Sequence, residues 1–286
     1  MIEAELEKKV LEEKAKGSPR EYIQNLLKEY LQVYLLYFLY TSPHYKDLIF
    51  TGGTCLRHFF GLGRLSVDLD FDYTTIPDSS QMLKQIGVFF HQRHQYPDFS
   101  GALKQGGDQI LLKFPVLRRL NLAKGAESDF LHVRIDLAKN RSPSFHAIKS
   151  SKNIYGFNFV ARHYDLPDLM AGKLHAVLKR RYLRGKENRQ TVKGRDYFDL
   201  LWFLKQGVVP NLRRLSDLLS EEVTLLEVER RCDEKVREFV VKHKGDFQSD
   251  ILPLLSNPGL IEEYIDNYQE EYQRIKHQSF RVVPVP

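Results

Sequence analysis

The chain has 286 residues, 42% hydrophobic and 28% charged, which is typical of a globular protein with one large domain or two moderate ones. It contains no uncharged apolar run of about 18 residues and begins with charged residues, so we expect neither a membrane span nor a signal peptide. The net charge of +6 is modest but unevenly distributed along the sequence.

Two helices are predicted before the first strand. Residues 2–16 have the pattern of a charged helical arm. Ser18, Pro19 and Glu21 then form a capping-box pattern, with Ser18 as the N-cap, that begins a second helix. Apolar residues recur at helical spacing from there to about Tyr40, so we expect this helix to pack across a sheet.

A strand followed by a glycine turn is predicted next. Residues 48–51 are apolar and partly β-branched, as in a buried strand. Gly52 and Gly53 allow the backbone to turn and to approach a ligand closely. Thr54 is the expected N-cap of a short helix over residues 55–60, and the amides at such a helix start favour an anion.

The following strand, residues 66–73, carries alternating aspartates. Side chains alternate between the two faces of a strand, so Asp68, Asp70 and Asp72 share one face and apolar residues occupy the other. Like charges at this spacing repel each other unless a cation lies among them, and paired carboxylates suit Mg²⁺. The alternative is an edge strand with its aspartates on a solvated face. The upstream glycine turn favours the metal site and indicates phosphoryl or nucleotidyl transfer.

Later elements include one candidate for a third metal ligand. We expect a helix over residues 79–95 and strands over residues 109–116, 130–138 and 153–162. In the second of these strands, Asp136 lies on the polar face, where it could join Asp68 and Asp70. An exposed Asp136 without a function is the alternative.

Two further predicted helices contain polar residues that are candidates for the functional site. Asp165 caps a helix that we expect to run to about Arg184, with Lys173 beside its apolar stripe. A snorkelling surface lysine is the alternative for Lys173. After a polar loop, a helix over residues 195–205 places Asp196 and Asp199 on one face. Three charged amphipathic helical stretches, near 211–243, 247–255 and 258–276, show no catalytic pattern.

The positive charge is concentrated between Lys173 and Arg195. This window contains nine Lys or Arg and one acid, so it carries +8 and the rest of the chain carries −2. Clustered positive charge indicates contact with phosphates, whereas a solvated basic face is the alternative. The candidate RNA-binding residues are Arg180, Arg181, Arg184, Lys186, Arg189 and Lys193.

The cysteines and histidines give no site of their own. Cys55 and Cys232 are too far apart to suggest a disulfide framework or a metal-binding spacing. The histidines are scattered, and the glycine motifs of P-loop and dinucleotide-binding proteins are absent from the sequence. With the charged N-terminus, these observations predict a cytoplasmic protein.

The motifs together resemble a known family. Gly-Gly-Thr at 52–54, Ser-Val-Asp-Leu-Asp-Phe at 66–71 and Arg-Asp-x-x-Asp-Leu at 195–200 are similar to the core of AbiEii/AbiGii-type nucleotidyltransferase toxins. These toxins belong to the DNA polymerase β-like nucleotidyltransferase superfamily. The resemblance covers roughly residues 48–205, and no key group of the pattern is missing.

The resemblance implies an α+β fold, a mixed β-sheet core flanked by helices with a helical C-terminal region. The expected domains are a nucleotidyltransferase core at 1–165 and a helical domain at 166–286 that closes the cleft. It also implies roles for the candidate residues. Mg²⁺ would be held by Asp68 and Asp70, with Asp136 as a third carboxylate; nucleotide phosphates would be held by Gly52, Gly53, Thr54 and Lys173; and Asp196 would be the late acid or base.

The resemblance further implies the toxin of a bacterial toxin–antitoxin pair linked to phage defence. Such an enzyme would transfer a nucleotide from an NTP to an RNA acceptor, with the tRNA 3′ end as a known acceptor class, and would have a cognate antitoxin as a partner. The basic window supports an RNA acceptor independently. The alternatives are transfer to a protein hydroxyl and a non-catalytic nucleotide-binding module of the same fold.

Overall fold

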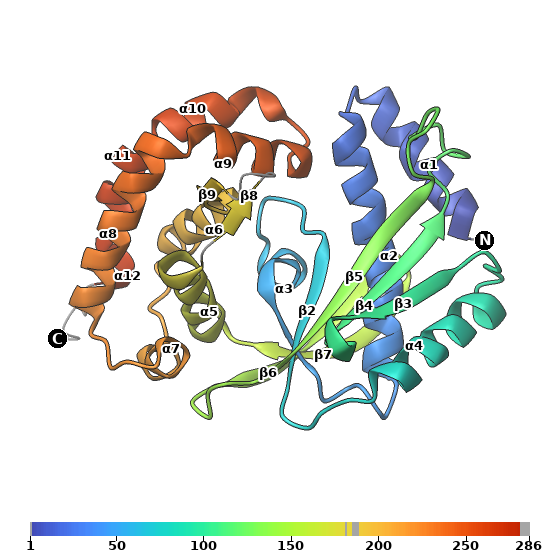
Figure 1. The fold of residues 1–286 in the computed structure, drawn as a ribbon, viewed down its shortest axis with the longest axis horizontal. Helices are drawn as coiled ribbons and strands as arrows, with labels where there is room; N and C mark the ends of the chain where they lie inside the picture. The colour runs from blue at the N-terminus through green and yellow to red at the C-terminus, as the bar shows by residue number, and fades with distance from the viewer. Residues whose placement is uncertain (1, 181, 185–188, 281–286) are drawn as a thin grey trace. The chain divides into compact units, whose positions relative to one another are not determined.

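The computed structural model describes residues 2–180, 182–184 and 189–280 (Figure 1). Internal contacts divide the chain into two compact units, and each is described separately. The sheet unit comprises residues 1–140 and 147–163, and the helical unit comprises residues 141–146 and 164–286. Among the described residues, no helix is both long enough and apolar enough to cross a membrane.

The sheet unit contains one seven-stranded sheet with the order β3-β4-β5-β2-β1-β7-β6. Its helices are α1 (Ile2–Ala15), α2 (Arg20–Thr41), α3 (Gly52–Phe60) and α4 (Ser79–Val88), with a π-helix at Phe89–Arg93 and a 3₁₀ turn at Gln105–Gly107. Its strands are β1 (Ile49–Thr51), β2 (Asp68–Tyr73), β3 (Ser100–Lys104), β4 (Gln109–Pro115), β5 (Phe130–Lys139), β6 (Ala147–Ile154) and β7 (Phe157–Tyr164).

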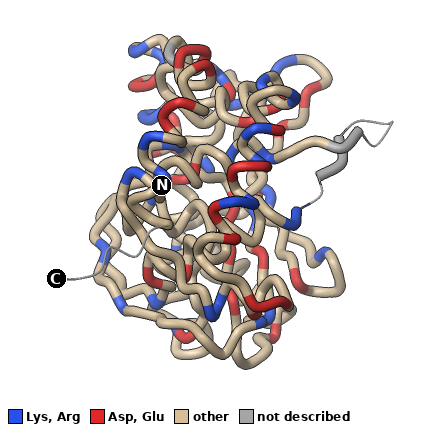
Figure 2. The backbone as a smooth tube through the Cα atoms, turned by 90° about the vertical axis from the view of Figure 1, so that its left-hand side faces the viewer, with Lys and Arg blue, Asp and Glu red and all other residues tan. Residues whose placement is uncertain are grey.

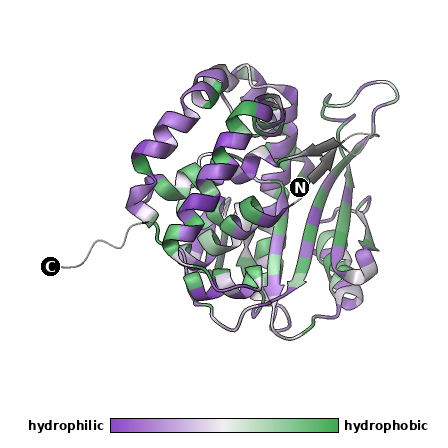
Figure 3. Ribbon diagram, turned by 60° about the vertical axis from the view of Figure 1, so that its left-hand side comes forward, coloured by the Kyte–Doolittle hydropathy of each residue, from purple (hydrophilic) through white to green (hydrophobic). Residues whose placement is uncertain are grey.

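The sheet is mixed. Strand β2 pairs with β5, and β1 with β7, in parallel, whereas β1–β2, β3–β4 and β4–β5 are antiparallel. Hydropathy alternates along these strands (Figure 3), and the apolar side chains of β2, Leu69 and Phe71, are buried. The predicted α+β fold with a mixed sheet is therefore confirmed.

Helix α2 packs across the sheet, as the sequence predicts. Leu31 and Leu35 of this helix are fully buried. The Gln32 side chain donates a hydrogen bond of 3.2 Å to the carbonyl of Ser66, just before β2. The Tyr40 hydroxyl donates one of 2.9 Å to the carbonyl of Arg162 in β7. The helix is therefore tied to two strands that lie on either side of β1.

The helical unit is built around an aromatic core. Its elements are α5 (Leu166–Lys179), a hairpin of β8 (Tyr182–Arg184) and β9 (Arg189–Thr191), α6 (Gly194–Lys205), α7 (Leu212–Leu219), α8 (Leu225–Lys242), α9 (Lys244–Ile251), 3₁₀ turns at Leu252–Leu254 and Pro258–Leu260, α10 (Ile261–Asp266), α11 (Tyr268–Ile275) and α12 (His277–Phe280). Tyr197 stacks on Phe239 with ring centroids 4.1 Å apart. The buried Tyr268 donates a 2.7 Å hydrogen bond to the carbonyl of Tyr197, which joins α11 to α6.

The predicted capping box of the second helix is wrong. Helix α2 begins at Arg20, and its N-cap residue is Pro19, which makes no side-chain cap. The Ser18 hydroxyl instead donates a 2.6 Å hydrogen bond to the carboxylate of Glu13, at the end of α1. Ser18 therefore joins the two helices rather than capping the second.

The predicted single strand over residues 153–162 is also wrong, because the chain forms a hairpin there. Strands β6 and β7 are joined at Tyr155 and Gly156, whose φ angles are 52° and 79°. Two consecutive residues with positive φ give the tight turn that suits a hairpin. Tyr155 is an unusual residue for that conformation, so this turn could not be predicted from residue type.

Several helices end earlier than predicted. The predicted helix 79–95 changes to a π-helix at Phe89, and the helix after Asp165 ends at Lys179 instead of Arg184. A β-hairpin follows where a loop was expected, and the stretch 211–243 divides at Ser220, which has a positive φ. Strand β3 was not predicted.

Candidate active site

The glycine turn lies directly against one of the aspartates. Helix α3 begins at Gly52, whose φ is +75°, a conformation that side-chain-bearing residues rarely adopt. A Cβ atom on Gly52 would lie 2.2 Å from Oδ2 of Asp70, and one on Gly53 would lie 2.8 Å from a guanidinium nitrogen of Arg64. The positive φ favours glycine at position 52, and a side chain at position 53 would displace Arg64; the Asp70 carboxylate sits at the positive N-terminal end of α3.

Thr54 has a different local role from the predicted N-cap. The N-cap residue of α3 is Thr51, and Thr54 lies fully buried within the helix. Its hydroxyl donates a hydrogen bond to the backbone carbonyl of Asp68. Thr54 thus connects α3 to the start of β2. Because its hydroxyl is used in this hydrogen bond, only the backbone amide of Thr54 could contact a nucleotide.

The carboxylates of β2 and β5 lie side by side. In the parallel register of these strands, Asp70 is opposite Asp136, and Asp68 is opposite Arg134. Opposite residues of neighbouring strands share a face, so Asp136 joins Asp68 and Asp70 on the polar side of the sheet. Their apolar neighbours in sequence, such as Leu69 and Ile135, are buried on the other side.

Arg134 lies among these carboxylates, and sequence reasoning gave it no role. Its guanidinium is 2.7 Å from Oδ2 of Asp68 and 2.9 Å from Oδ2 of Asp136. Burial alone would lower the pKa of Arg134, but the charges of Asp68 and Asp136 outweigh it and raise that pKa. Gln109, on β4, donates a 2.8 Å hydrogen bond to the other oxygen of Asp136. The spacing of Arg134 and Asp136, two residues apart on one strand, could have predicted that Arg134 lies on the same face as the aspartates.

The chemistry of these groups fits a hard divalent cation. Carboxylate oxygens are the ligands that Mg²⁺ prefers, and the side chains of Asp68 and Asp136 keep 21% and 29% of their surface exposed. Within the described part of the chain, no three His, Cys, Asp or Glu side chains already converge as a metal cluster. The predicted set of Asp68, Asp70 and Asp136 is therefore not arranged as a three-ligand cluster, whereas Mg²⁺ in phosphate-transfer sites needs only one or two carboxylates besides substrate phosphates.

The helical unit contains a second group of candidates. Lys173, on α5, places Nζ 3.2 Å from Oδ1 of Asp196 and 2.6 Å from Oδ2 of Asp199, both on α6. The Asp199 side chain is fully buried, and that of Lys173 is 15% exposed. The alternative of a solvated surface lysine is thus excluded.

Asp165 caps α5 as predicted, because its carboxylate accepts a 3.0 Å hydrogen bond from the amide of Asp168.

Asp196 is held in its charged form. Burial would raise the pKa of this carboxyl group, but Lys173 and Arg180 outweigh burial and lower it. Arg180 contributes a 2.6 Å contact between its guanidinium and Oδ2 of Asp196. At neutral pH Asp196 is therefore an acceptor of hydrogen bonds, with Oδ1 against Lys173 and Oδ2 against Arg180.

Only part of the candidate RNA-binding set is described. Arg181 and Lys186 lie outside the described residues, and so do the side chains of Arg184 and Arg189, whose backbones belong to β8 and β9. Arg180 is paired with Asp196, and Lys193 is half-buried just before α6. Figure 2 shows basic residues interleaved with acidic ones along the described backbone.

Helix α9 anchors the segment between the hairpin and α6. The buried Thr191 donates a hydrogen bond to the carboxylate of Asp246, and the amide of Gly194 donates one of 2.8 Å to Asp250. A Cβ atom on Gly194 would lie 2.6 Å from the α carbon of Phe247. These contacts fix the first turn of α6, which carries Asp196. Sequence reasoning missed them because α9 lies about 50 residues downstream.

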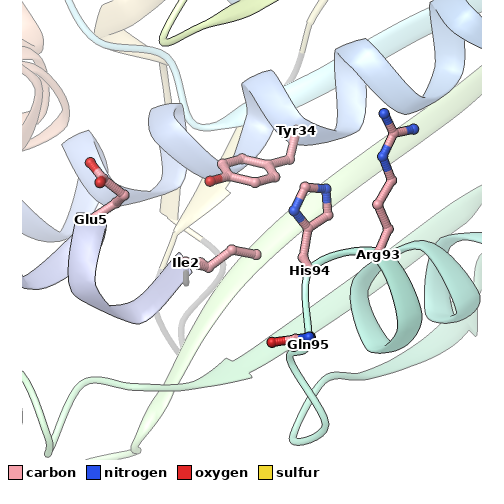
Figure 4. A pocket seen from close by; sticks show the side chains of 6 residues that line it. All are labelled: Ile2, Glu5, Tyr34, Arg93, His94 and Gln95. Atoms are coloured by element: carbon pink, nitrogen blue, oxygen red, sulfur yellow. The ribbon is translucent and has the colours of Figure 1, made fainter.

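A pocket of about 210 Å³ lies elsewhere in the sheet unit, between α1, α2 and the π-helix (Figure 4). Its lining residues are Ile2, Glu5, Tyr34, Arg93, His94 and Gln95. None of the predicted site residues lines it, so it is separate from the carboxylate cluster.

Comparison with protein families gives one match. The model described as "Nucleotidyl transferase AbiEii toxin, Type IV TA system" matches residues 34–284. This range includes the glycine turn, the aspartates of β2 and β5, and the Lys173 cluster. No curated protein matches the chain.

Solved structures share the fold. The nucleotidyltransferase toxin MenT4 from Mycobacterium tuberculosis is 19% identical, with a TM-score of 0.55 over 96% of this chain and 89% of that chain. JHP933 from Helicobacter pylori is 18% identical, with a TM-score of 0.50 over 88% of this chain and 91% of that chain. At this identity the similarity shows the fold, a nucleotidyltransferase-like α+β arrangement.

Proposed function

Because the chain belongs to the AbiEii family of nucleotidyltransferase toxins of type IV toxin–antitoxin systems, we propose that it transfers a nucleoside monophosphate from an NTP to RNA. The acceptor that we propose is the 3′ end of tRNA, and the metal is Mg²⁺. The observation that carries this proposal is the contact between the glycine turn and Asp70, with Asp136 opposite on the next strand.

The sheet unit would bind the nucleotide and the metal. Asp68 and Asp70, with Asp136, would hold Mg²⁺, which when bound polarises the phosphate oxygens. The amides at the start of α3, from Gly52 to Thr54, would donate hydrogen bonds to the phosphates. Gly52 and Gly53 keep this helix start open, because a side chain at either position would collide with Asp70 or Arg64.

The helical unit would supply the remaining groups. We propose that the predicted domains, 1–165 and 166–286, correspond to the sheet and helical units, apart from residues 141–146 and 164–165, which belong to the helical unit, and that the helical domain closes over the nucleotide. Lys173 would then offset charge on the phosphates, and Asp196 would orient the acceptor hydroxyl. That oxygen forms a bond to the α-phosphorus, the bond to pyrophosphate breaks, and the hydroxyl proton passes to Asp196 or to water.

The partners follow from the family and from the charge distribution. A toxin of this class implies a cognate antitoxin and an NTP substrate. The +8 window between Lys173 and Arg195 supports an RNA acceptor, since phosphate contacts need Lys and Arg. Both cysteines are free and buried, which supports a cytoplasmic location, where thiols stay reduced.

The experiment is nucleotide transfer by the purified chain. Each of the four α-labelled NTPs is incubated with Mg²⁺ and total tRNA, and label in RNA is compared with label in protein. We expect label at RNA 3′ ends, together with pyrophosphate release. Label in protein would assign the acceptor to a protein hydroxyl instead, and absence of any transfer or pyrophosphate release would contradict the proposed activity.

A further inference from the structure

The Arg134 guanidinium lies between carboxylates that are the predicted ligands of a metal ion. It contacts Asp68 and Asp136 at 2.7 and 2.9 Å, and it projects from β5 on the face that carries Asp68, Asp70 and Asp136. The Arg134 side chain is 37% exposed, so it is not locked inside the core. A planar guanidinium matches carboxylate oxygens with two parallel contacts, as it does phosphate oxygens.

These contacts compete with a metal ion. Oδ2 of Asp68 and Oδ2 of Asp136 point at Arg134, while Gln109 donates to Oδ1 of Asp136. A cation that binds at these two Oδ2 atoms would therefore replace the ion pairs of Arg134. Without a new partner, the displaced guanidinium loses two attractive contacts, and that loss weakens the binding of metal alone.

We propose that Arg134 couples metal binding to nucleotide binding. In the free protein Arg134 neutralises Asp68 and Asp136 and holds metal affinity low. The triphosphate brings anionic oxygens to the same face, and the displaced guanidinium pairs with them. Metal and nucleotide then bind with positive coupling, so that the carboxylates take up metal chiefly when a nucleotide is present. This inference rests on the proposed metal site at Asp68 and Asp70.

The experiment measures Mn²⁺ binding by electron paramagnetic resonance, with no turnover required. The parent is compared with Arg134→Gln, which removes the charge, and with Arg134→Lys, which keeps the charge but not the paired geometry. Arg20→Gln is the matched control, because it breaks an arginine–carboxylate pair, with Glu127, that involves none of the three aspartates. Each protein is titrated with and without a non-hydrolysable nucleoside triphosphate analogue.

The parent should bind Mn²⁺ weakly alone and about tenfold more tightly with the analogue, within the usual range of coupling between linked sites. Arg134→Gln should bind Mn²⁺ alone more tightly than the parent and lose most of the coupling, and Arg134→Lys should be intermediate. The melting temperature should rise more on Mn²⁺ addition in Arg134→Gln than in the parent, because metal then replaces the missing charge.

Three results are decisive. If Arg134→Gln folds and binds Mn²⁺ as the parent and Arg20→Gln do, with the same coupling, the inference is wrong although the metal site stands. If Arg134→Gln does not fold, Arg134→Lys must show tighter Mn²⁺ binding alone, and equal binding overturns the inference. If the parent binds no Mn²⁺ even with the analogue, the proposed metal site is wrong, and the inference with it.

Discussion

Gly52 and Asp70 are in direct contact: the α carbon of Gly52 packs against the carboxylate of Asp70, and a Cβ atom would lie 2.2 Å from Oδ2. The contact joins the first residue of α3 to the centre of β2. It explains why the glycine turn and the aspartates occur together in the sequence. The N-terminal end of α3, which would attract an anion, and the candidate metal ligand therefore lie together.

Replacing Gly52 by Ala should therefore displace Asp70. Gly61 provides a matched control, because its φ of +76° is nearly the same but a Cβ atom there would meet nothing within 4 Å. Both variants should lose about 1–2 kcal/mol of unfolding free energy from the left-handed backbone. Only Gly52→Ala should also lose nucleotide transfer, by about 10²-fold, because a misplaced electrostatic group has that cost.

The measurement is urea unfolding of both variants beside their rates of pyrophosphate release. Equal activity of folded Gly52→Ala and Gly61→Ala would show that the position of Asp70 does not depend on Gly52.

Removing the charge of Lys173 should destabilise the helical unit. Asp196 and Asp199 are buried and both contact Lys173, so Lys173→Met removes a shared cation from two buried carboxylates, of which Asp196 keeps its contact with Arg180. Breaking a buried pair in this way costs about 3 kcal/mol. Lys205→Met is the control, because its pair with Glu271 is at the surface and should cost less than about 1 kcal/mol. Equal unfolding free energies for the two variants would contradict a structural role for Lys173.

The sequence predicted local features more reliably than long-range contacts. The alternation in residues 66–73 was enough to place Asp68 and Asp70 on one face, since strand periodicity is local. The mixed sheet and the capping role of Asp165 were also predicted correctly. The role of Ser18 was not, because its hydroxyl has a competing acceptor in Glu13 of the preceding helix.

In the candidate site, too, contacts between residues far apart in sequence could not be predicted. The sequence placed Asp136 on a polar strand face, but only the register of β2 and β5 brings Asp136 beside Asp70. Likewise, the ion pairs of Lys173 with Asp196 and Asp199 depend on how α5 packs on α6. Pairing partners far apart in sequence are set by tertiary packing, which periodicity does not encode.

Acid should destabilise the sheet unit through His58, a residue of α3 that is 5% exposed. Burial, then the charges of Lys152 and Arg57, lowers the pKa of His58 from 6.5 to about 3. Between these pH values the unfolded chain binds a proton that the folded chain excludes. The stability from neutral His58 is therefore complete above pH 6.5 and is lost as pH falls toward 3.

His58→Gln should reduce the loss of unfolding free energy between pH 7 and pH 5 by up to about 2 kcal/mol. The exposed His44 provides the control, and His44→Gln should keep the pH dependence of the parent. Urea unfolding at several pH values makes the comparison. A His58→Gln protein with the parent's pH dependence would contradict this role of His58.

The hairpin between α5 and α6 should control the salt dependence of RNA binding. Arg184→Gln with Arg189→Gln removes two charges of the basic window, so the log–log salt slope should flatten by about 1.4 if both contact single-stranded phosphates. Arg180 is left intact because it pairs with Asp196. Arg230→Gln with Lys235→Gln on α8 is the control, since those charges lie outside the window. Identical salt slopes for tRNA binding in all three proteins would exclude the hairpin as an RNA contact.

The central claim is that Asp68 and Asp70 form the metal-dependent transfer site. Its most direct test is labelled nucleotide transfer to tRNA by the parent and by Asp68→Asn with Asp70→Asn, at matched folded concentration and saturating Mg²⁺. Asn is nearly isosteric with Asp, the repulsion between the two carboxylates disappears, and Arg134 keeps its contact with Asp136, so the variant should fold. We expect transfer to fall by about 10²-fold or more, as for the loss of a major electrostatic group. Undiminished transfer by the folded double variant would contradict the account.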